Sequence, residues 1–208
     1  MEERNNFGLK TGRIEALSDG IFAIAMTILI LSFETVLNQS GQIREEDLLE
    51  MLLGMWPDLL HYMESFIILG AFWYQHHRQF HYIRRVDRGL LVLNIGALMF
   101  IGLIPFSTVM VSDFGDSFVV AALFEINLLI AGIVYFFHWL YASRKGRLID
   151  PSVDPCVIRF YSKRNFIIPA VSLCAIALSY FSPRVGLITY FAVPAILFFW
   201  ERPNMADL

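Results

Sequence analysis

The sequence predicts an all-α integral membrane protein with six transmembrane helices. Of its 208 residues, 57% are hydrophobic and 17% are charged, and the mean hydropathy is +0.57. Soluble domains contain about 25% charged residues, so this composition points to the bilayer. Apolar stretches recur along the chain, and the basic residues fall almost entirely on one side of them.

Six stretches have the length and apolar character of membrane spans. A span needs about 20 residues, because the hydrocarbon core is about 30 Å thick and a helix rises about 1.5 Å per residue. We predict spans at residues 13–36, 58–83, 88–111, 117–143, 165–181 and 183–200. No low-complexity tract or internal repeat separates them, so residues 1–208 are expected to form a single six-span membrane domain.

The predicted spans differ in how they begin and end. The first begins with the charged sequence RIEALSD, and the second follows an amphipathic piece that stops at Pro57. The third begins at Arg88 and carries Pro105 near its outer end. The fourth runs from Ser117 to Ser143. The fifth and sixth are rich in aromatic residues, which is typical of packing helices with aromatic belts at the membrane interface.

The distribution of basic residues predicts the orientation. Six spans place both termini on one side, and cytoplasmic loops carry an excess of Lys and Arg. If both termini are cytoplasmic, only Arg44 and Arg184 lie on the outer side, which leaves 14 of the 16 Lys and Arg residues inside. We therefore expect a multi-pass protein with both termini in the cytoplasm.

The first span presents one continuous helical face. At about 100° per residue, an apolar stripe with arginine at its cytoplasmic end falls within about 40° of one line. The stripe consists of Arg13, Leu17, Gly20, Ile24, Ile28 and Leu31. Thr27 lies about 60° to one side, and Asp19 lies about 140° away from Ile24. The pattern is typical of a packing or lipid-facing surface, and it is also what one wall of an ion pathway requires.

Ionisable residues bound a short uncharged segment in this span. The 14 residues between Asp19 and Glu34 cover about 21 Å, less than the hydrocarbon core of about 30 Å. One or both acids therefore lie at membrane depth or face water inside the protein, unless one sits at the headgroup boundary. Because Asp19 points away from the stripe, we expect it to need a partner on another helix.

A cluster of histidine and tryptophan ends the second span, where the sequence runs FWYQHHRQFH. Trp73 and His77 share a helical face at the i, i+4 spacing. The chain has five histidines in all, too few for a multi-histidine metal centre. We expect the cluster instead to form hydrogen bonds with Arg13, Ser18 and Asp19 at the same depth.

Three other polar residues fall inside predicted spans. Asn94 lies in the third span and is expected to bridge neighbouring helices, as polar side chains do inside membranes. Glu125 and Asn127 lie in the fourth span, and the sequence offers no obvious partner for either.

The sequence gives no support for catalysis or nucleic-acid binding. The motifs GxGxxG, GxSxG and HExxH do not occur, and neither does the TVGYG filter of ordinary potassium channels. Cys156 and Cys174 lack paired or CxxC spacing, and the net charge is −3. We expect no catalytic residues, no cofactor, no metal and no nucleic-acid partner.

The stretch RIEALSDGIFAIAMTILIL resembles the RxxxFSD signature helix of the transmembrane protein 175 family of potassium-permeable channels. The resemblance continues in WYQHH of the second span and in the asparagine and IPF of the third, so its motifs cover roughly the first half of the chain. Arg13, Ser18 and Asp19 match the signature. Leu17 stands where the motif has phenylalanine, which removes an aromatic packing contact.

The resemblance implies a prokaryotic homotetramer in the plasma membrane, with the first helices around a central pore and no P-loop filter. The apolar neck would act as gate and selectivity element, with Ile24 as the narrowest ring and Ile28 and Leu31 as the next. Thr27 would supply a hydroxyl layer. The inner ends would be held by Arg13, Leu17, Ser18 and Asp19, supported by Trp73, His77 and Asn94. The permeant ion would be K⁺ among monovalent cations, and the partners would be other copies of the chain and the lipid bilayer.

Two alternatives follow from the residues. A secondary or proton-coupled transporter could use the intramembrane carboxylates Asp19, Glu64 or Glu125. Carriers usually contain internal repeats and helices broken at mid-membrane, whereas this sequence has no repeat and its prolines lie near span ends. A membrane enzyme using the histidines is disfavoured by the small number of ligands.

Overall fold

The structure is a computed structural model that describes residues 11–31, 33 and 44–200. Within these ranges the chain forms α-helices and short 3₁₀ turns, and no strand of a sheet. The all-helical fold class predicted from the sequence is confirmed.

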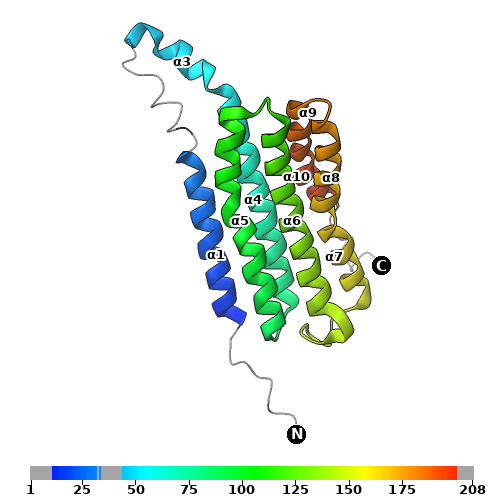
Figure 1. The fold of residues 1–208 in the computed structure, drawn as a ribbon. Coiled ribbons are helices and arrows are strands. Elements are labelled where there is room, and N and C mark those ends of the chain that lie inside the picture. Colours follow the sequence, from blue (N-terminus) through cyan, green and yellow to red (C-terminus); the bar gives the residue numbers. More distant parts are fainter. Residues whose placement is uncertain (1–10, 32, 34–43, 201–208) are drawn as a thin grey trace.

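Four long helices account for most of the described chain: α1 (Thr11–Ile28, continued by the 3₁₀ turn η1, Leu29–Leu31), α4 (Trp56–Tyr82), α5 (Arg88–Phe114) and α6 (Phe118–Ser143). The shorter elements are η2 (Glu45–Asp47), α3 (Leu48–Gly54), η3 (Arg144–Gly146), α7 (Pro155–Asn165), α8 (Ile167–Ser179), α9 (Pro183–Ile188), η4 (Thr189–Phe191) and α10 (Ala192–Phe199). Figure 1 shows the long helices side by side, with α1 at one edge of the bundle and α7 to α10 at the other. The helix α3 projects away from the bundle above α4.

In the part of the chain that the structure describes, three helices are long and apolar enough to cross a membrane, namely Thr11–Leu31, Arg88–Phe114 and Phe118–Gly146. The second predicted span is occupied by α4, which has 27 residues and a more polar sequence. The fifth is occupied by α8, which has 13 residues. The six-span count therefore stays a prediction. The predicted end of the first span, with Glu34, lies outside the described residues.

Prolines shape the last two predicted spans. Pro169 has no N–H to donate to the carbonyl of Asn165, where α7 ends. Pro194 likewise cannot donate to Tyr190, and the chain before it tightens into the 3₁₀ turn η4. The predicted span over 183–200 is therefore built from α9, η4 and α10 in place of one regular helix.

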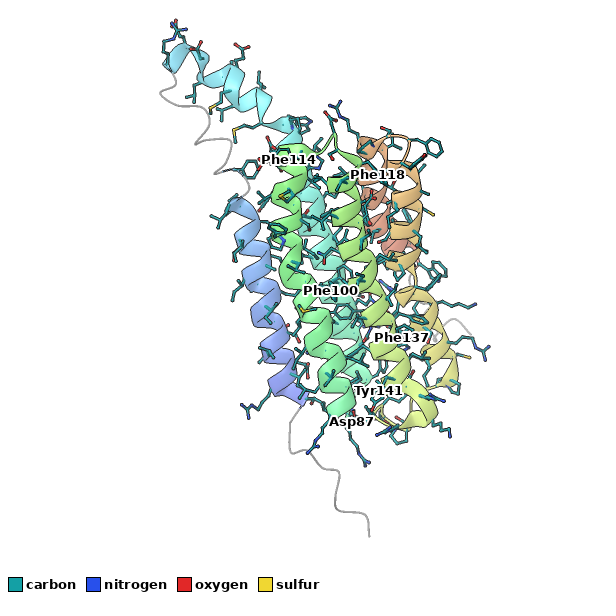
Figure 2. The ribbon with its side chains drawn as sticks, in the orientation of Figure 1. Asp87, Phe100, Phe114, Phe118, Phe137 and Tyr141 are labelled. Carbon is teal, nitrogen blue, oxygen red and sulfur yellow. The ribbon has the colours of Figure 1, made fainter. Side chains whose placement is uncertain are left out.

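Asp87 fixes the turn between α4 and α5. Its carboxylate accepts a hydrogen bond of 2.9 Å from a backbone N–H in the first turn of α5, which caps that helix. The hydroxyl of Tyr141 on α6 donates to Asp87 at 2.9 Å, and Arg147 pairs with it at 2.8 Å. Figure 2 shows Asp87 and Tyr141 at one end of the bundle, opposite Phe114 and Phe118. Two connections remote in sequence are thus held together at the end that the basic residues assign to the cytoplasm.

Candidate pore-lining helix and its inner-end contacts

One face of α1 attaches this helix to the bundle. The buried residues recur at intervals of three or four and are Ile14, Ser18, Phe22, Ala25 and, in η1, Leu29. This face packs on α4 and α5, and its apolar members belong to the two hydrophobic core clusters of the described residues. Burial at this spacing is what a helix at the edge of a bundle requires.

The predicted stripe lies on the exposed face of α1. The side chains of Ile24, Ile28 and Leu31 are 59%, 43% and 53% exposed. Leu17, in the position of the signature phenylalanine, is 48% exposed and belongs to the same face. The chain therefore leaves the predicted stripe uncovered, together with neighbouring residues of the same helix such as Ala23 and Thr27.

An apolar groove of about 430 Å³ adjoins the stripe. Ile24, Ile28 and Leu31 line its α1 side, and Pro105 and Phe106 line its α5 side. Contiguous exposed apolar surface of this kind marks contact with lipid or with another protein surface.

Thr27 lies beside the stripe and is also exposed. Its hydroxyl donates to the backbone carbonyls of Ala23 and Ile24, with both oxygen–oxygen distances at 2.9 Å. Because the proton is directed at the helix backbone, the lone pairs of the hydroxyl oxygen remain available. Thr27 can therefore offer an oxygen ligand to a cation without breaking its own hydrogen bonds.

A buried chain of hydrogen bonds joins α1, α5 and α4. The side-chain nitrogen of Asn94 donates to the hydroxyl of Ser18 at 3.2 Å, and Ser18 donates to the carbonyl of Ile14 at 2.9 Å. Nε2 of His76 lies 3.1 Å from the side-chain oxygen of Asn94. That oxygen can only accept, so His76 is the donor and carries a proton on Nε2. The three side chains are at most 1% exposed, and each bond orients the next.

Asp19 makes a second contact between α1 and α4. The indole nitrogen of Trp73 donates to its carboxylate at 2.9 Å. The ring of His77 stacks on Trp73, with centroids 5.7 Å apart and planes inclined by 22°. Asp19 thus has a partner on another helix, as expected from its direction away from the stripe. Together the two contacts fix the rotation of α1 about its axis.

His76 takes the role that the sequence assigns to its neighbour His77. The sequence predicts His77 as the inner-end histidine, but it is exposed, whereas His76 is buried and makes the bond to α5. Neighbouring helical residues point about 100° apart, so only one of the two histidines can face the core. The i, i+4 series Phe72, His76, Phe80 was the available signal, because both phenylalanines are buried core residues.

Arg13 also differs from the expectation. It was expected to bond to the tryptophan and histidine cluster, but it is exposed and has no hydrogen bond or ion pair with any residue in the described ranges. The reason is geometric. Arg13 lies about 120° from Asp19 around α1, so its side chain leaves the helix away from Trp73, the partner of Asp19 on α4.

Replacing Trp73 with phenylalanine tests the contact with Asp19. The change removes the indole donor and leaves an aromatic ring against His77. We therefore expect the free energy of unfolding to fall by about 1 kcal/mol, the net value of a typical hydrogen bond. Differential scanning calorimetry of the detergent-solubilised protein measures it. The control is the same substitution in an Asp19→Ala background, where no further loss is expected; an equal loss in both backgrounds would show that the bond adds no stability.

The other intramembrane carboxylates have partners away from α1. Glu125 of α6 is fully buried and accepts a hydrogen bond from Ser179 of α8, a partner that the sequence did not reveal. Glu64 of α4 is 3% exposed and lies 3.7 Å from Nδ1 of His61 on the same helix. Asn127 donates to a backbone carbonyl of α5 at 3.2 Å.

The residues that hold α1 to α4 and α5 fall in a segment shared with known proteins. A family model described as the endosomal/lysosomal potassium channel TMEM175 matches residues 13–105. A protein of Streptomyces collinus named as a potassium channel is 36% identical over 149 residues, which are 70% of this chain and 70% of that protein. The chain belongs to the TMEM175 family.

Further similarities extend beyond the matched segment. A TMEM175 relative from Chamaesiphon minutus, named as a potassium channel, is 32% identical over 176 residues, covering 83% of this chain and 86% of its own. The crystal structure of a lysosomal potassium-selective channel TMEM175 homolog from Chamaesiphon minutus superposes with a TM-score of 0.77 at 27% identity. It covers 92% of this chain and 98% of that one. The relatives are named as channels and not as enzymes, in agreement with the lack of catalytic motifs.

Proposed function

We propose that the chain is the subunit of a potassium channel, a homotetramer in a prokaryotic plasma membrane with both termini in the cytoplasm. In this proposal the subunit crosses the membrane six times, and α1 of each copy lines a central pore without a P-loop filter. The observation that carries it is the division of α1 into two faces. One face is fixed to α4 and α5 by polar contacts, and the other exposes an apolar stripe at the edge of the bundle.

The stripe supports a hydrophobic gate. Rings of Ile24, Ile28 and Leu31 around a four-fold axis would form an apolar neck, and a narrow apolar neck stops ions by losing its water. No charged plug is then needed for closure. Potassium holds its hydration shell less tightly than sodium, so such a neck favours K⁺ modestly, without the carbonyl cage of a filter.

Thr27 supports a polar layer next to the neck. Its hydroxyl already satisfies its own donor on the helix backbone, so its oxygen is free to replace a water of a passing cation. A small rotation of α1 would exchange isoleucine for threonine at the pore surface, because Thr27 lies about 60° from the stripe.

The inner-end contacts restrain such a rotation of α1. Ser18 and Asp19 hold α1 to Asn94 and Trp73 at two points. A helix anchored at its inner end pivots there, so its outer part, with Ile24 to Leu31, moves furthest. We propose that these contacts set the closed-state rotation of α1. No cofactor takes part in this mechanism.

Reconstitution of the purified protein tests the proposal directly. Native mass spectrometry should give four copies. Liposomes loaded with KCl should release K⁺ down its gradient once a protonophore lets H⁺ enter to balance the charge, without any added valinomycin. A monomer that exchanges K⁺ strictly against another ion would contradict the channel and favour the transporter alternative. In that case Glu64→Gln or Glu125→Gln should abolish exchange, whereas a channel lined by α1 should retain its flux.

A further inference from the structure

A cavity of about 610 Å³ opens at the end of the bundle where α4 begins and α5 ends. It is separate from the stripe of α1, and α9 and η4 complete its wall. Binding sites for small molecules typically measure about 300–1,000 Å³ and combine apolar walls with a few polar groups. Apolar side chains supply much of the wall here, including Leu60, Val111, Leu187, Ile188 and Phe191.

Glu64 is the polar group that gives the cavity its character. It lines the cavity although its side chain is only 3% exposed. One carboxylate oxygen, Oε2, lies 3.7 Å from Nδ1 of His61, and the other, Oε1, is buried with no hydrogen-bond partner among the described residues. A buried acceptor of this kind carries a desolvation cost that a ligand donor would remove.

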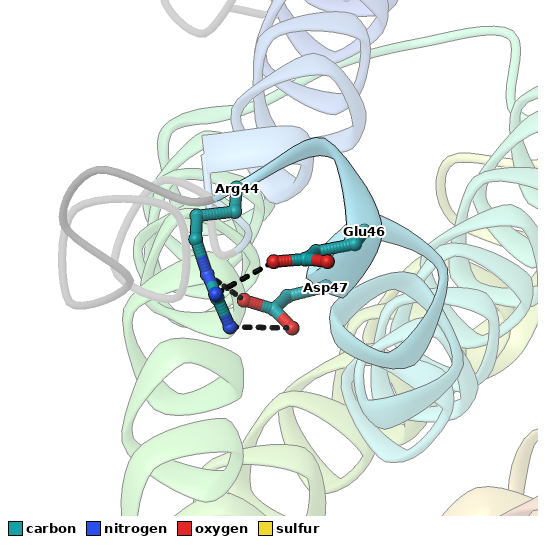
Figure 3. Close-up of polar contacts among 3 residues, drawn as sticks. All are labelled: Arg44, Glu46 and Asp47. Carbon is teal, nitrogen blue, oxygen red and sulfur yellow. Dashed lines mark hydrogen bonds and ion pairs between the residues drawn. The ribbon is translucent and has the colours of Figure 1, made fainter.

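Arg184 on the cavity wall and Arg44 in the segment before α3 are already paired with other acids. Arg184, on the cavity wall, makes two hydrogen bonds with Asp116, at 2.7 and 2.9 Å. Arg44 lies before α3 and pairs with Glu46 at 2.6 Å and Asp47 at 3.0 Å, as Figure 3 shows. Neither arginine is therefore available to Glu64.

The remaining charge on the cavity wall is negative. Asp113 also lines the cavity, and it makes no ion pair with any described residue. The wall thus carries three carboxylates and one guanidinium, with His61 as a further base. An anionic ligand would be repelled, and a cation would be attracted.

A single metal ion fits this cavity poorly. The described residues contain no group of three His, Cys, Asp or Glu side chains placed to hold one. A volume of about 610 Å³ with apolar walls also exceeds what one ion fills. The cavity fits a larger cation whose charged end reaches Glu64 and whose body rests on the apolar wall.

We propose that this cavity binds a primary ammonium compound with an apolar body, and that Glu64 is the residue that receives its charge. The ammonium donates to Oε1 of Glu64, and the apolar body contacts Leu60, Leu187 and Ile188. The ammonium group could belong to a free amine or to the ethanolamine head of a lipid.

The test uses 1-naphthylmethylamine and its neutral counterpart 1-naphthylmethanol as probes, titrated by calorimetry into the protein in phosphatidylcholine nanodiscs, with empty discs as background. We expect saturable binding of the amine and about tenfold weaker binding in Glu64→Gln, the usual scale of a lost charge-assisted hydrogen bond. The alcohol should bind more weakly and should not distinguish the two proteins. Glu50→Gln, at an exposed position of α3, is the matched control and should leave the amine affinity unchanged.

Equal binding of amine and alcohol to the wild-type protein would overturn the proposal. An unchanged amine affinity in Glu64→Gln would do the same. If Glu64→Gln does not fold, Ile188→Trp at the exposed rim keeps the test decisive, because it narrows the cavity and should abolish amine binding without disturbing Glu64. Nanodiscs containing phosphatidylethanolamine distinguish the two sources: weaker amine binding there identifies the lipid head as a competitor, and unchanged binding identifies a free amine. The readout is binding, so it stands or falls independently of ion conduction.

Discussion

Replacing Ile24 with asparagine is expected to raise potassium flux through the reconstituted protein by about tenfold, the effect of lowering a barrier by about 1.4 kcal/mol. Ile24 is 59% exposed in the subunit and lies at the centre of the stripe. In the proposed tetramer, four amide side chains in place of four isoleucines would keep water in the neck, so the barrier to ion entry falls. Liposome flux with K⁺ and with Na⁺ measures both the rate and the expected loss of selectivity.

The matched control is Ile30→Asn in the same helix. Ile30 is 54% exposed, similar to Ile24, but it points about 120° away from it at about 100° per residue. In the proposed channel Ile30 would face away from the pore, so this substitution should leave the flux per tetramer nearly unchanged. Equal effects of the two substitutions would remove Ile24 from the constriction, and so would a normal flux in Ile24→Asn.

The stripe could be predicted from the sequence because it is a property of one helix. Regular helical geometry fixes the angles among Arg13, Ile24, Ile28 and Leu31 once the helix is assumed, whatever the neighbouring helices do. The same holds for the direction of Asp19. The all-helical fold class was equally accessible, because long apolar stretches have few alternatives in a bilayer.

Partners on other helices could not be predicted in this way. The choice of His76 over His77 depends on which face of α4 meets α1 and α5, and the sequence of α4 does not fix that face. The contact of Glu125 on α6 with Ser179 on α8 joins two residues that are 54 positions apart in the sequence. No local pattern marks the pair. Pro194 was visible, but whether a proline kinks a helix or divides it is decided by the packing around it.

The family model and the contacts that hold α1 fall in the same part of the chain. The family model ends at Pro105, within α5, so it includes α1, α4 and most of α5 and none of α6. Ser18, Asp19, Trp73, His76 and Asn94 all fall within it. The helices that hold α1 are therefore ones that the family model covers, as the proposed rotation of α1 would require.

Replacing Asn94 with leucine is expected to be the most destabilising of these substitutions at the inner end. Asn94 is fully buried and is the central member of the chain from His76 to Ser18. Leucine has a similar size but neither donor nor acceptor, so His76 loses its acceptor and the hydroxyl of Ser18 loses its donor. Each stranded buried group costs about 1–3 kcal/mol, and a lowered melting temperature in calorimetry should report the sum.

Asn127→Leu supplies the comparison that separates this loss from the general cost of removing a buried amide. Asn127 is 7% exposed and makes one hydrogen bond, to a backbone carbonyl, while its side-chain oxygen has no partner among the described residues. Its replacement leaves fewer buried groups without a partner and removes an oxygen that has none already. It should therefore lower the free energy of unfolding clearly less than Asn94→Leu. Because Asn94 contacts α1 and Asn127 does not, replacement of Asn94 should also alter potassium flux per proposed tetramer, whereas Asn127→Leu should not. Similar losses of stability with unaltered flux in both variants would mean that the chain of hydrogen bonds does not control the position of α1.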